Sequence, residues 1–189
     1  MTKVISEGVG AFYQHYPKVA AIVTAQAGGK ENAMTVDWHT SLSFNPPLYG
    51  ICIAPERLAY RLIIASKEFG INFLPFETVD LVHLVGSTGG QQMDKFKRFN
   101  ITRDQPIKTK VPILQAAYAA YECQLVDDRD YGDHRLLVGE IVAVHLSPEA
   151  FTPEKTLDLD KVSPVLYLGH ELYLTSSRDT LRHLGHVVY

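Results

Sequence analysis

Residues 32–47 combine short polar side chains with aromatic rings. The segment reads Asn-Ala-Met-Thr-Val-Asp-Trp-His-Thr-Ser-Leu-Ser-Phe-Asn-Pro-Pro. Hydroxyl and main-chain N–H groups can hold a phosphate, while aromatic and apolar side chains can flank a flat heterocycle. Polar anchors inside a mostly apolar cleft are typical of a cofactor site. A polar strand followed by a proline-rich loop is the alternative interpretation of the same residues.

Two further segments carry residues that could do chemistry. Residues 86–96 read Gly-Ser-Thr-Gly-Gly-Gln-Gln-Met-Asp-Lys-Phe, and glycine lets main-chain N–H groups approach an anion closely. The spacing matches neither a Walker loop nor a Rossmann fingerprint, and a surface turn is the alternative. His134 follows a Gly-Asp pair, at the end of a turn from which an imidazole can reach a neighbouring cleft. The alternative interpretation of His134 is a surface histidine next to a turn.

The composition is that of an ordinary globular chain and argues against several function classes. Of the 189 residues, 46% are hydrophobic and 21% are charged, and the net charge of -3 provides no basic surface for nucleic acid. Two cysteines, Cys52 and Cys123, are too few for a disulfide framework and are expected to be reduced core thiols. The histidines lack metal-binding spacing, so we expect no bound metal. Without a signal-like start or an apolar run of roughly 20 residues, we expect a cytoplasmic protein that contacts no membrane.

The elements that must position these residues are mostly short strands. Many short strands at close intervals favour an all-β barrel or sandwich, and the helices are too few and short to cover both faces of a parallel sheet. We expect an extended loop at 43–47, because two prolines follow each other there, and a polar turn at 127–133. The expected strands are 18–26, 32–38, 48–53, 69–74, 117–126, 134–145, 165–168 and 172–174. One helix is expected to begin at Pro55. A second is expected over 78–85, with Gly86 as its stop, and one or two further helical turns are expected over 94–99.

Together these motifs resemble those of the flavin reductase-like family. Residues 32–47 are similar to its FMN-binding signature, and three further matches follow in order at 68–75, at 86–96 and at 132–134 with 138–141. The resemblance covers about residues 14–146. It implies a mainly β fold, the FMN-binding split β-barrel of Greek-key type with a few short helices, in one domain over 1–189. Strands within 163–189 would cover the barrel or contact a second subunit of a homodimer.

The resemblance also implies which residues contact the cofactor FMN, with FAD as an alternative. His134 is the candidate catalytic residue, placed near the nicotinamide and the flavin ring as a positioning group rather than a nucleophile. Asn72 either faces the site or caps its strand. The implied flavin-binding residues are Asn32, Ala33, Met34, Thr35, Val36, Trp38, Ser41, Ser43, Asn72, Ser87, Thr88, Gly89, Gly90, Lys95 and Phe96.

The implied activity is hydride transfer from NAD(P)H to N5 of the flavin, with electrons passed to free flavin, a monooxygenase partner or ferric iron. A non-catalytic FMN-binding electron carrier that docks on a redox partner is the alternative, and a relative that binds haem or pyridoxine phosphate is a third reading. Two residues depart from the family pattern. Gln91 stands where many members carry arginine, and Asp37 stands where serine is common. Because a carboxylate repels a phosphate, we expect Asp37 to point away or pair with a nearby Lys or Arg.

Overall fold

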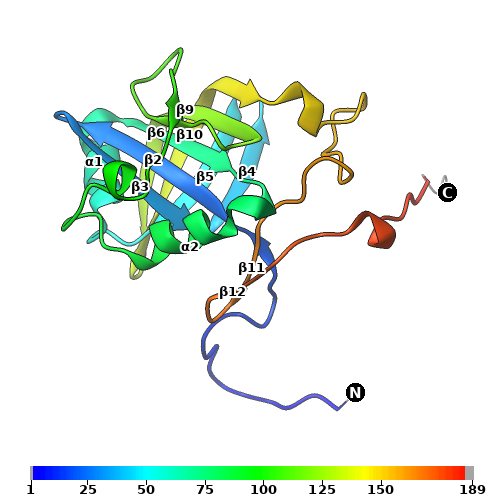
Figure 1. Cartoon of the computed structure of the whole chain (residues 1–189). Helices are drawn as coiled ribbons and strands as arrows, with labels where there is room; N and C mark the ends of the chain where they lie inside the picture. The colour runs from blue at the N-terminus through cyan, green and yellow to red at the C-terminus, as the bar shows by residue number, and fades with distance from the viewer. Residues whose placement is uncertain (1, 186–189) are drawn as a thin grey trace.

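The computed structural model describes residues 2–185 (Figure 1). Its centre is a seven-stranded antiparallel sheet in the order β3-β2-β6-β9-β10-β5-β4, accompanied by a three-stranded sheet β1-β11-β12 and the pair β7-β8. The strands are β1 (Lys18–Val19), β2 (Ala21–Ala27), β3 (Lys30–Val36), β4 (His39–Phe44), β5 (Pro47–Ile53), β6 (Glu68–Phe73), β7 (Arg103–Asp104), β8 (Ile113–Leu114), β9 (Ala119–Tyr131), β10 (His134–Leu146), β11 (Leu166–Gly169) and β12 (Leu172–Leu174). The helices are α1 (Leu58–Ser66), α2 (Val79–Ser87) and α3 (Lys95–Arg98), with 3₁₀ turns at Phe76–Thr78, Pro148–Ala150 and Arg178–Thr180.

Strand β2 is apolar on both faces because both faces are covered. Side chains alternate across a strand, so Ala21 and Val23 face the interior of the curved sheet, whereas Ile22 packs with α2 and α3 on the outside. Each of these residues is fully buried. This double burial explains the continuous apolar run that the sequence shows at this strand.

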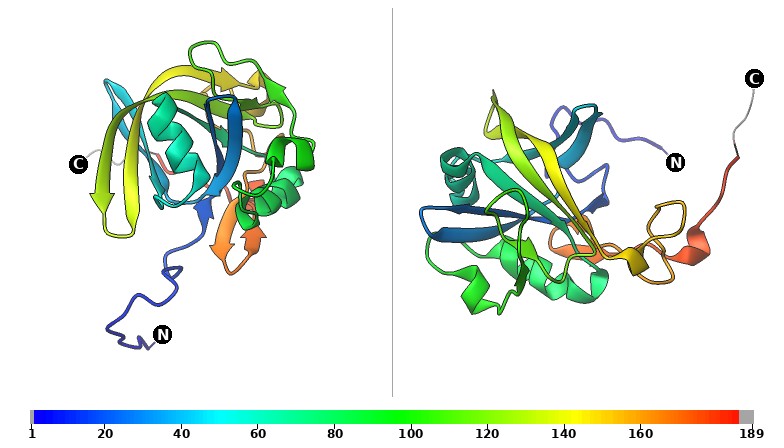
Figure 2. Two further views of the ribbon diagram at one scale, coloured as in Figure 1. Left: turned by 90° about the vertical axis from the view of Figure 1, so that its left-hand side faces the viewer. Right: turned by 90° about the horizontal axis from the view of Figure 1, so that it is seen from above.

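Helix α1 fills the hollow of the sheet. Figure 2 shows the sheet curving around α1, with β2 and β3 on one side of the helix and β4 and β5 on the other. The helix buries Ala59, Leu62 and Ile63 in the same core as the interior strand residues. The apolar spacing of three and four residues gives the helix this single buried stripe.

A glycine at position 139 permits the bend that curves the sheet. The pairing of β9 with β10 shifts register between Val138 and Gly139, and such bulges increase local twist. A Cβ atom at Gly139 would lie 2.5 Å from the ring of Phe69 and 2.7 Å from Cβ of Cys123. The close approach of the Phe69 ring to this backbone therefore requires glycine.

The expected fold class is confirmed: the chain is mainly β, with few short helices, and has the flavin-binding split-barrel fold. Most predicted elements are present within a few residues of their expected bounds. The strands expected at 165–168 and 172–174 exist as β11 and β12, where β11 pairs with β1 and β12 pairs with β11. Residues 186–189 of the predicted C-terminal segment lie outside the described part of the chain. Across residues 2–185, no helix is long and apolar enough to cross a bilayer.

Three expected boundaries are wrong. The polar turn predicted at 127–133 is mostly strand, because β9 continues to Tyr131 and its acidic residues pair across to Arg135, whose Nε donates to Oδ1 of Asp128 at 2.6 Å. The extended loop predicted at 43–47 is shorter, since β4 runs to Phe44 and β5 begins at Pro47. Helix α2 does not stop at Gly86 and includes Ser87.

Candidate functional site

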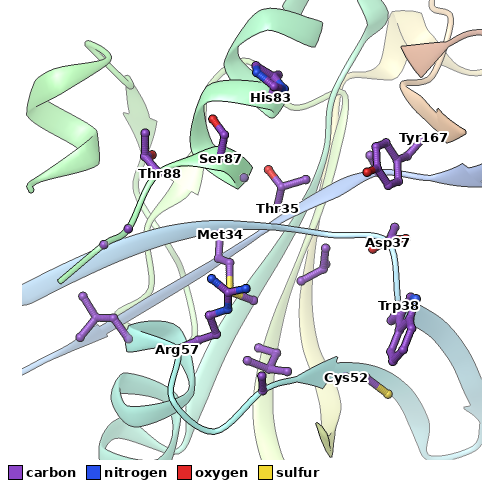
Figure 3. Close-up of a pocket in the computed structure, with 18 of the residues that line it drawn as sticks. Met34, Thr35, Asp37, Trp38, Cys52, Arg57, His83, Ser87, Thr88 and Tyr167 are labelled. Carbon is purple, nitrogen blue, oxygen red and sulfur yellow. The ribbon is translucent and has the colours of Figure 1, made fainter. Parts of the chain in front are cut away.

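A cavity of about 740 Å³ lies along the edge strand β3. Its walls come from β3, the loop after α2, the start of α1, residues 11–16 and the hairpin β11–β12. Figure 3 shows Ser87 and Thr88 on one side of the cavity, Arg57 beside Met34 on another, and Trp38, Asp37 and Tyr167 together at a third. This volume is in the usual range for a cofactor site.

Eleven of the sequence-predicted contact residues, His134 included, line this one cavity. Strand β3 and the residues that follow it contribute five of them, and the segment 86–96 contributes five more. These residues are far apart in sequence, and the packing of α2 against β3 brings them together. The lining residues are Asn32, Met34, Thr35, Val36, Trp38, Ser87, Thr88, Gly89, Gly90, Lys95 and His134.

Five predicted contact residues do not line the cavity, and two of these lie in the core. Ala33 is fully buried and packs with α2 and α3 on the opposite face of β3, because side chains alternate along a strand. Phe96 is buried in the same core, and the guanidinium of Arg103 lies 4.9 Å from its ring centroid.

The other three lie on β4 and β6. Ser41 and Ser43 are on β4, the opposite edge of the large sheet from β3. Asn72 on β6 neither faces the cavity nor caps its strand. Its amide nitrogen donates to the carbonyl of Ile22 at 3.0 Å, and its Oδ1 accepts from the N–H of Leu114 at 2.8 Å. Asn72 therefore ties β6 to its neighbours.

Lys95 is buried, with 3% of its surface exposed. Its Nζ donates to the carbonyl oxygens of Ala33 at 2.9 Å and Val85 at 2.7 Å. Burial, and to a lesser extent the positive charge of Arg57, lowers the pKa of Lys95 to about 8. The ammonium group thus ties α3 to β3 and to the last turn of α2.

Thr35 attaches α2 to β3 from inside the cavity. Its Oγ1 donates to the carbonyl of Val82 at 2.6 Å, so the hydroxyl hydrogen is already used. What Thr35 offers a ligand is the lone pairs of its oxygen and its methyl group.

Asn32 is a polar residue of the cavity wall whose side chain has no hydrogen-bond partner within the described chain. It is only 4% exposed and lines the cavity, and within residues 2–185 its amide makes no hydrogen bond. A Cβ atom on Gly90 would lie 2.1 Å from Oδ1 of Asn32, so the loop after α2 passes close to this amide because residue 90 is glycine. Buried polar groups are nearly always hydrogen-bonded, and an open amide on a cavity wall therefore points to a ligand.

The other end of the cavity is an aromatic cluster linked by hydrogen bonds. The hydroxyl of Tyr16 donates to the carboxylate of Asp37 and accepts from Nε1 of Trp38 at 2.9 Å. Burial and the bond to Asp37 raise the pKa of Tyr16 above its ordinary value. Asp37 lines the cavity and pairs with a tyrosine rather than with a Lys or Arg, the second of the two arrangements expected for it.

His134 lies at this aromatic end. Its ring centroid is 4.8 Å from that of Trp38, and its Nδ1 is 2.8 Å from Oδ1 of Asp133. That hydrogen bond lowers the pKa of the Asp133 carboxyl. An imidazole oriented by a carboxylate and packed beside an indole ring has a defined direction.

Sequence reasoning missed several residues that line the cavity. Arg57 comes from the start of α1, and its place beside a helix N-terminus was a readable signal. The tyrosines have no comparable local signal, because they come from the two ends of the described chain. Cys52, expected in the core, is half-buried and lines the cavity, where burial raises the pKa of its thiol. The missed residues include Tyr13, Tyr16, Cys52, Glu56, Arg57, His83, Gln91, Gln92, Tyr167, Glu171 and Tyr173.

Comparison with known proteins decides the family. The model of the flavin reductase like domain matches residues 13–174. The chain belongs to this flavin reductase-like family. A protein of Pyrococcus abyssi is 38% identical over 136 residues, which are 72% of this chain and 78% of the relative.

Two further relatives carry descriptive names. The FMN-binding protein from Thermus thermophilus, solved with bound 1-cyclohex-2-enone, is 33% identical with a TM-score of 0.87, and the match covers 97% of this chain and 100% of that one. The reductase component of an FADH(2)-dependent resorcinol hydroxylase from Rhizobium is 29% identical, over 75% of this chain and 80% of the relative.

The residues of the cavity fit a flavin. Family membership and the FMN-binding neighbour support flavin binding, and the cavity offers an open amide at Asn32, a guanidinium at Arg57 and aromatic walls at Trp38 and Tyr16. Within residues 2–185, no group of His, Cys, Asp and Glu side chains is arranged to hold a metal ion.

Proposed function

We propose that this flavin reductase-like protein is an FMN-dependent oxidoreductase that takes hydride from NADH or NADPH. The observation that carries the proposal is the polarity of its cavity. Figure 3 shows the guanidinium of Arg57 beside Met34, away from Trp38 and Asp37, and Tyr16 is hydrogen-bonded to both of these residues at the aromatic end. An FMN molecule has the same polarity, with a phosphate at one end and a flat ring at the other. When bound, it supplies a ring that accepts hydride at N5 and releases the electrons to an acceptor.

The protein's part in this chemistry is to bind and orient. The hydrogen bonds that join Tyr16, Asp37 and Trp38 hold the indole ring in one position at the mouth of the aromatic end. His134, oriented by Asp133, is suited to position the nicotinamide rather than to attack it. The proposal therefore needs no protein nucleophile.

The test is anaerobic reduction of the protein loaded with FMN. NADH or NADPH is added without air, and we expect bleaching of the flavin absorption band together with loss of nicotinamide absorbance. Protein loaded with FAD measures the preference between the two flavins, and FMN without protein gives the background rate. Flavin that binds but is reduced no faster than this background would refute the reductase proposal.

A non-catalytic flavin carrier is the second candidate, and one observation favours it. The aromatic end of the cavity carries the carboxylates of Asp37 and Glu171, which repel the diphosphate of a nicotinamide dinucleotide. A carrier would bind FMN tightly and turn over slowly with free nicotinamide. Steady-state kinetics with excess free FMN separates the two candidates, because a reductase reduces many FMN molecules per protein molecule and a carrier does not. Protein acceptors, a monooxygenase partner among them, and ferric iron are then tested with the reduced protein.

We also propose that the protein is a homodimer. Strand β4 is an unpaired edge of the large sheet and presents Phe44, which is 100% exposed, and the exposed Leu42. Exposed apolar edge strands are candidates for pairing with another chain. Sedimentation of Phe44→Glu against the wild type tests this proposal, which predicts a shift from dimer to monomer. A wild type that sediments as a monomer would contradict it.

A further inference from the structure

We propose that the flavin phosphate is bound at the start of α1, by the guanidinium of Arg57 and the open main-chain N–H groups of the first turn, whereas Lys95 positions the surrounding loops. The inference rests on the proposed FMN binding and assigns the anion-binding residues within it. It departs from the family-based expectation in one respect, because that expectation counts Lys95 among the residues that contact the flavin directly.

Lys95 has little left to offer an anion. An ammonium group has three donors, and two of them are used by the carbonyls of Ala33 and Val85. The side chain is also nearly closed off from the surface. Gln91, at the position where many family members carry arginine, has no charge to offer, and its Nε2 already donates one hydrogen bond to the carbonyl of Glu56 at 3.1 Å.

Arg57 is the exposed guanidinium on the cavity wall. In the described chain it makes no ion pair and no side-chain hydrogen bond, so all its donors are available. It is also the residue that precedes α1, a helix of nine residues with no acidic side chain in its first turn and no side-chain cap. The first N–H groups of a helix lack partners within it and favour an anion.

The open amide of Asn32 is an independent sign of a ligand at this end. Gly90 passes against that amide, and the next residue, Gln91, is hydrogen-bonded to Glu56 directly before Arg57. These contacts bring the amide, the loop and the start of α1 to one end of the cavity. In Figure 3, Arg57 lies beside Met34, away from the group formed by Asp37, Trp38 and Tyr167.

One carboxylate, that of Glu56, opposes this assignment. Its side chain is exposed, lines the same cavity and makes no ion pair with Arg57. Its charge therefore weakens phosphate binding by a modest amount, as expected for a solvated group. Removing the charge of Glu56 should strengthen FMN binding, whereas removing the charge of Arg57 should weaken it. Glu56→Gln is therefore a second and independent test variant.

The experiment compares FMN with riboflavin, which has the same ring and ribityl chain but no phosphate. Dissociation constants are measured by quenching of flavin fluorescence, without nicotinamide, for the wild type, Arg57→Met, Lys95→Met, Glu56→Gln and the control Arg61→Met on the exposed side of α1. We expect Arg57→Met to weaken FMN roughly 10- to 100-fold, the range for a charge-assisted hydrogen bond, with riboflavin unchanged. Glu56→Gln strengthens FMN binding a few-fold, and Arg61→Met changes neither ligand.

Lys95→Met separates positioning from phosphate binding. A positioning role predicts that it weakens FMN and riboflavin by the same factor. The assignment is overturned if Arg57→Met leaves FMN affinity unchanged or weakens riboflavin equally, or if Lys95→Met is selective for FMN. Added salt should weaken FMN binding by the wild type more than by Arg57→Met. A wild type that binds neither flavin overturns the proposed function itself, and is thereby distinguished from failure of the Arg57 assignment alone.

Discussion

Glu122→Gln should remove a large, pH-dependent part of the stability of this barrel. Glu122 on β9 is 0% exposed. Its carboxylate accepts hydrogen bonds from the N–H groups of Ile107, Lys108 and Thr109 at 2.7–2.9 Å, and lies 2.7 Å from Nε2 of His145. Burial alone would raise the pKa of Glu122, but these hydrogen bonds outweigh it and lower the pKa to about 2.

The magnitude follows from linkage between protonation and folding. The difference between the ordinary value of 4.5 and a folded value of about 2 is worth about 3 kcal/mol of unfolding free energy. Because the folded pKa of Glu122 is the lower one, this stabilisation is fully present above pH 4.5. It is lost progressively as the pH falls from 4.5 to about 2.

The assay is urea unfolding of the wild type and Glu122→Gln at several pH values from 7 downward. We expect the variant to be less stable at pH 7 by about 3 kcal/mol, and the difference to shrink toward low pH. Glu154→Gln, at an exposed carboxyl group without a hydrogen bond in the described chain, is the matched control and should follow the wild type. Stability differences that stay constant down to low pH would refute the reasoning.

Three further changes test the site and the sheet. Lys95→Met removes the ammonium group that donates to the carbonyl oxygens of Ala33 and Val85. It should lower the unfolding free energy by about 2–4 kcal/mol, measured by thermal denaturation. Gly139→Ala places a Cβ atom against the ring of Phe69 and should cost about 1–3 kcal/mol, measured in urea. Trp38 is the single tryptophan of the chain and lines the cavity, so its fluorescence should fall when FMN binds.

Each of these predictions has an outcome that contradicts it. A Lys95→Met protein as stable as the wild type would mean that water replaces the lost donor. An unchanged Gly139→Ala protein would show that the Phe69 ring moves aside without cost. Tryptophan fluorescence that is insensitive to FMN, in a protein that binds FMN by other criteria, would place the flavin away from Trp38.

Local patterns were sufficient for most of the strands and for part of the site wall. The apolar run of β2 and the polar segment 32–38 are visible in sequence because each strand's environment is set by its own two faces. The turn predicted at 127–133 failed for the opposite reason. Acidic residues there are typical of a turn in isolation, but Arg135 on the facing strand supplies the partner that keeps them in β9.

The sequence by itself predicted the class of fold and, through its resemblance to a family, a cofactor cleft along residues 32–38 and 86–96, because those signals lie in contiguous segments. Only the tertiary structure decided which polar groups remain available in the cleft. Lys95 and Gln91 are polar in any reading of the sequence, yet packing commits both to main-chain carbonyls and leaves Arg57 open. Whether a donor is already used depends on residues distant in the chain, and no local pattern records that.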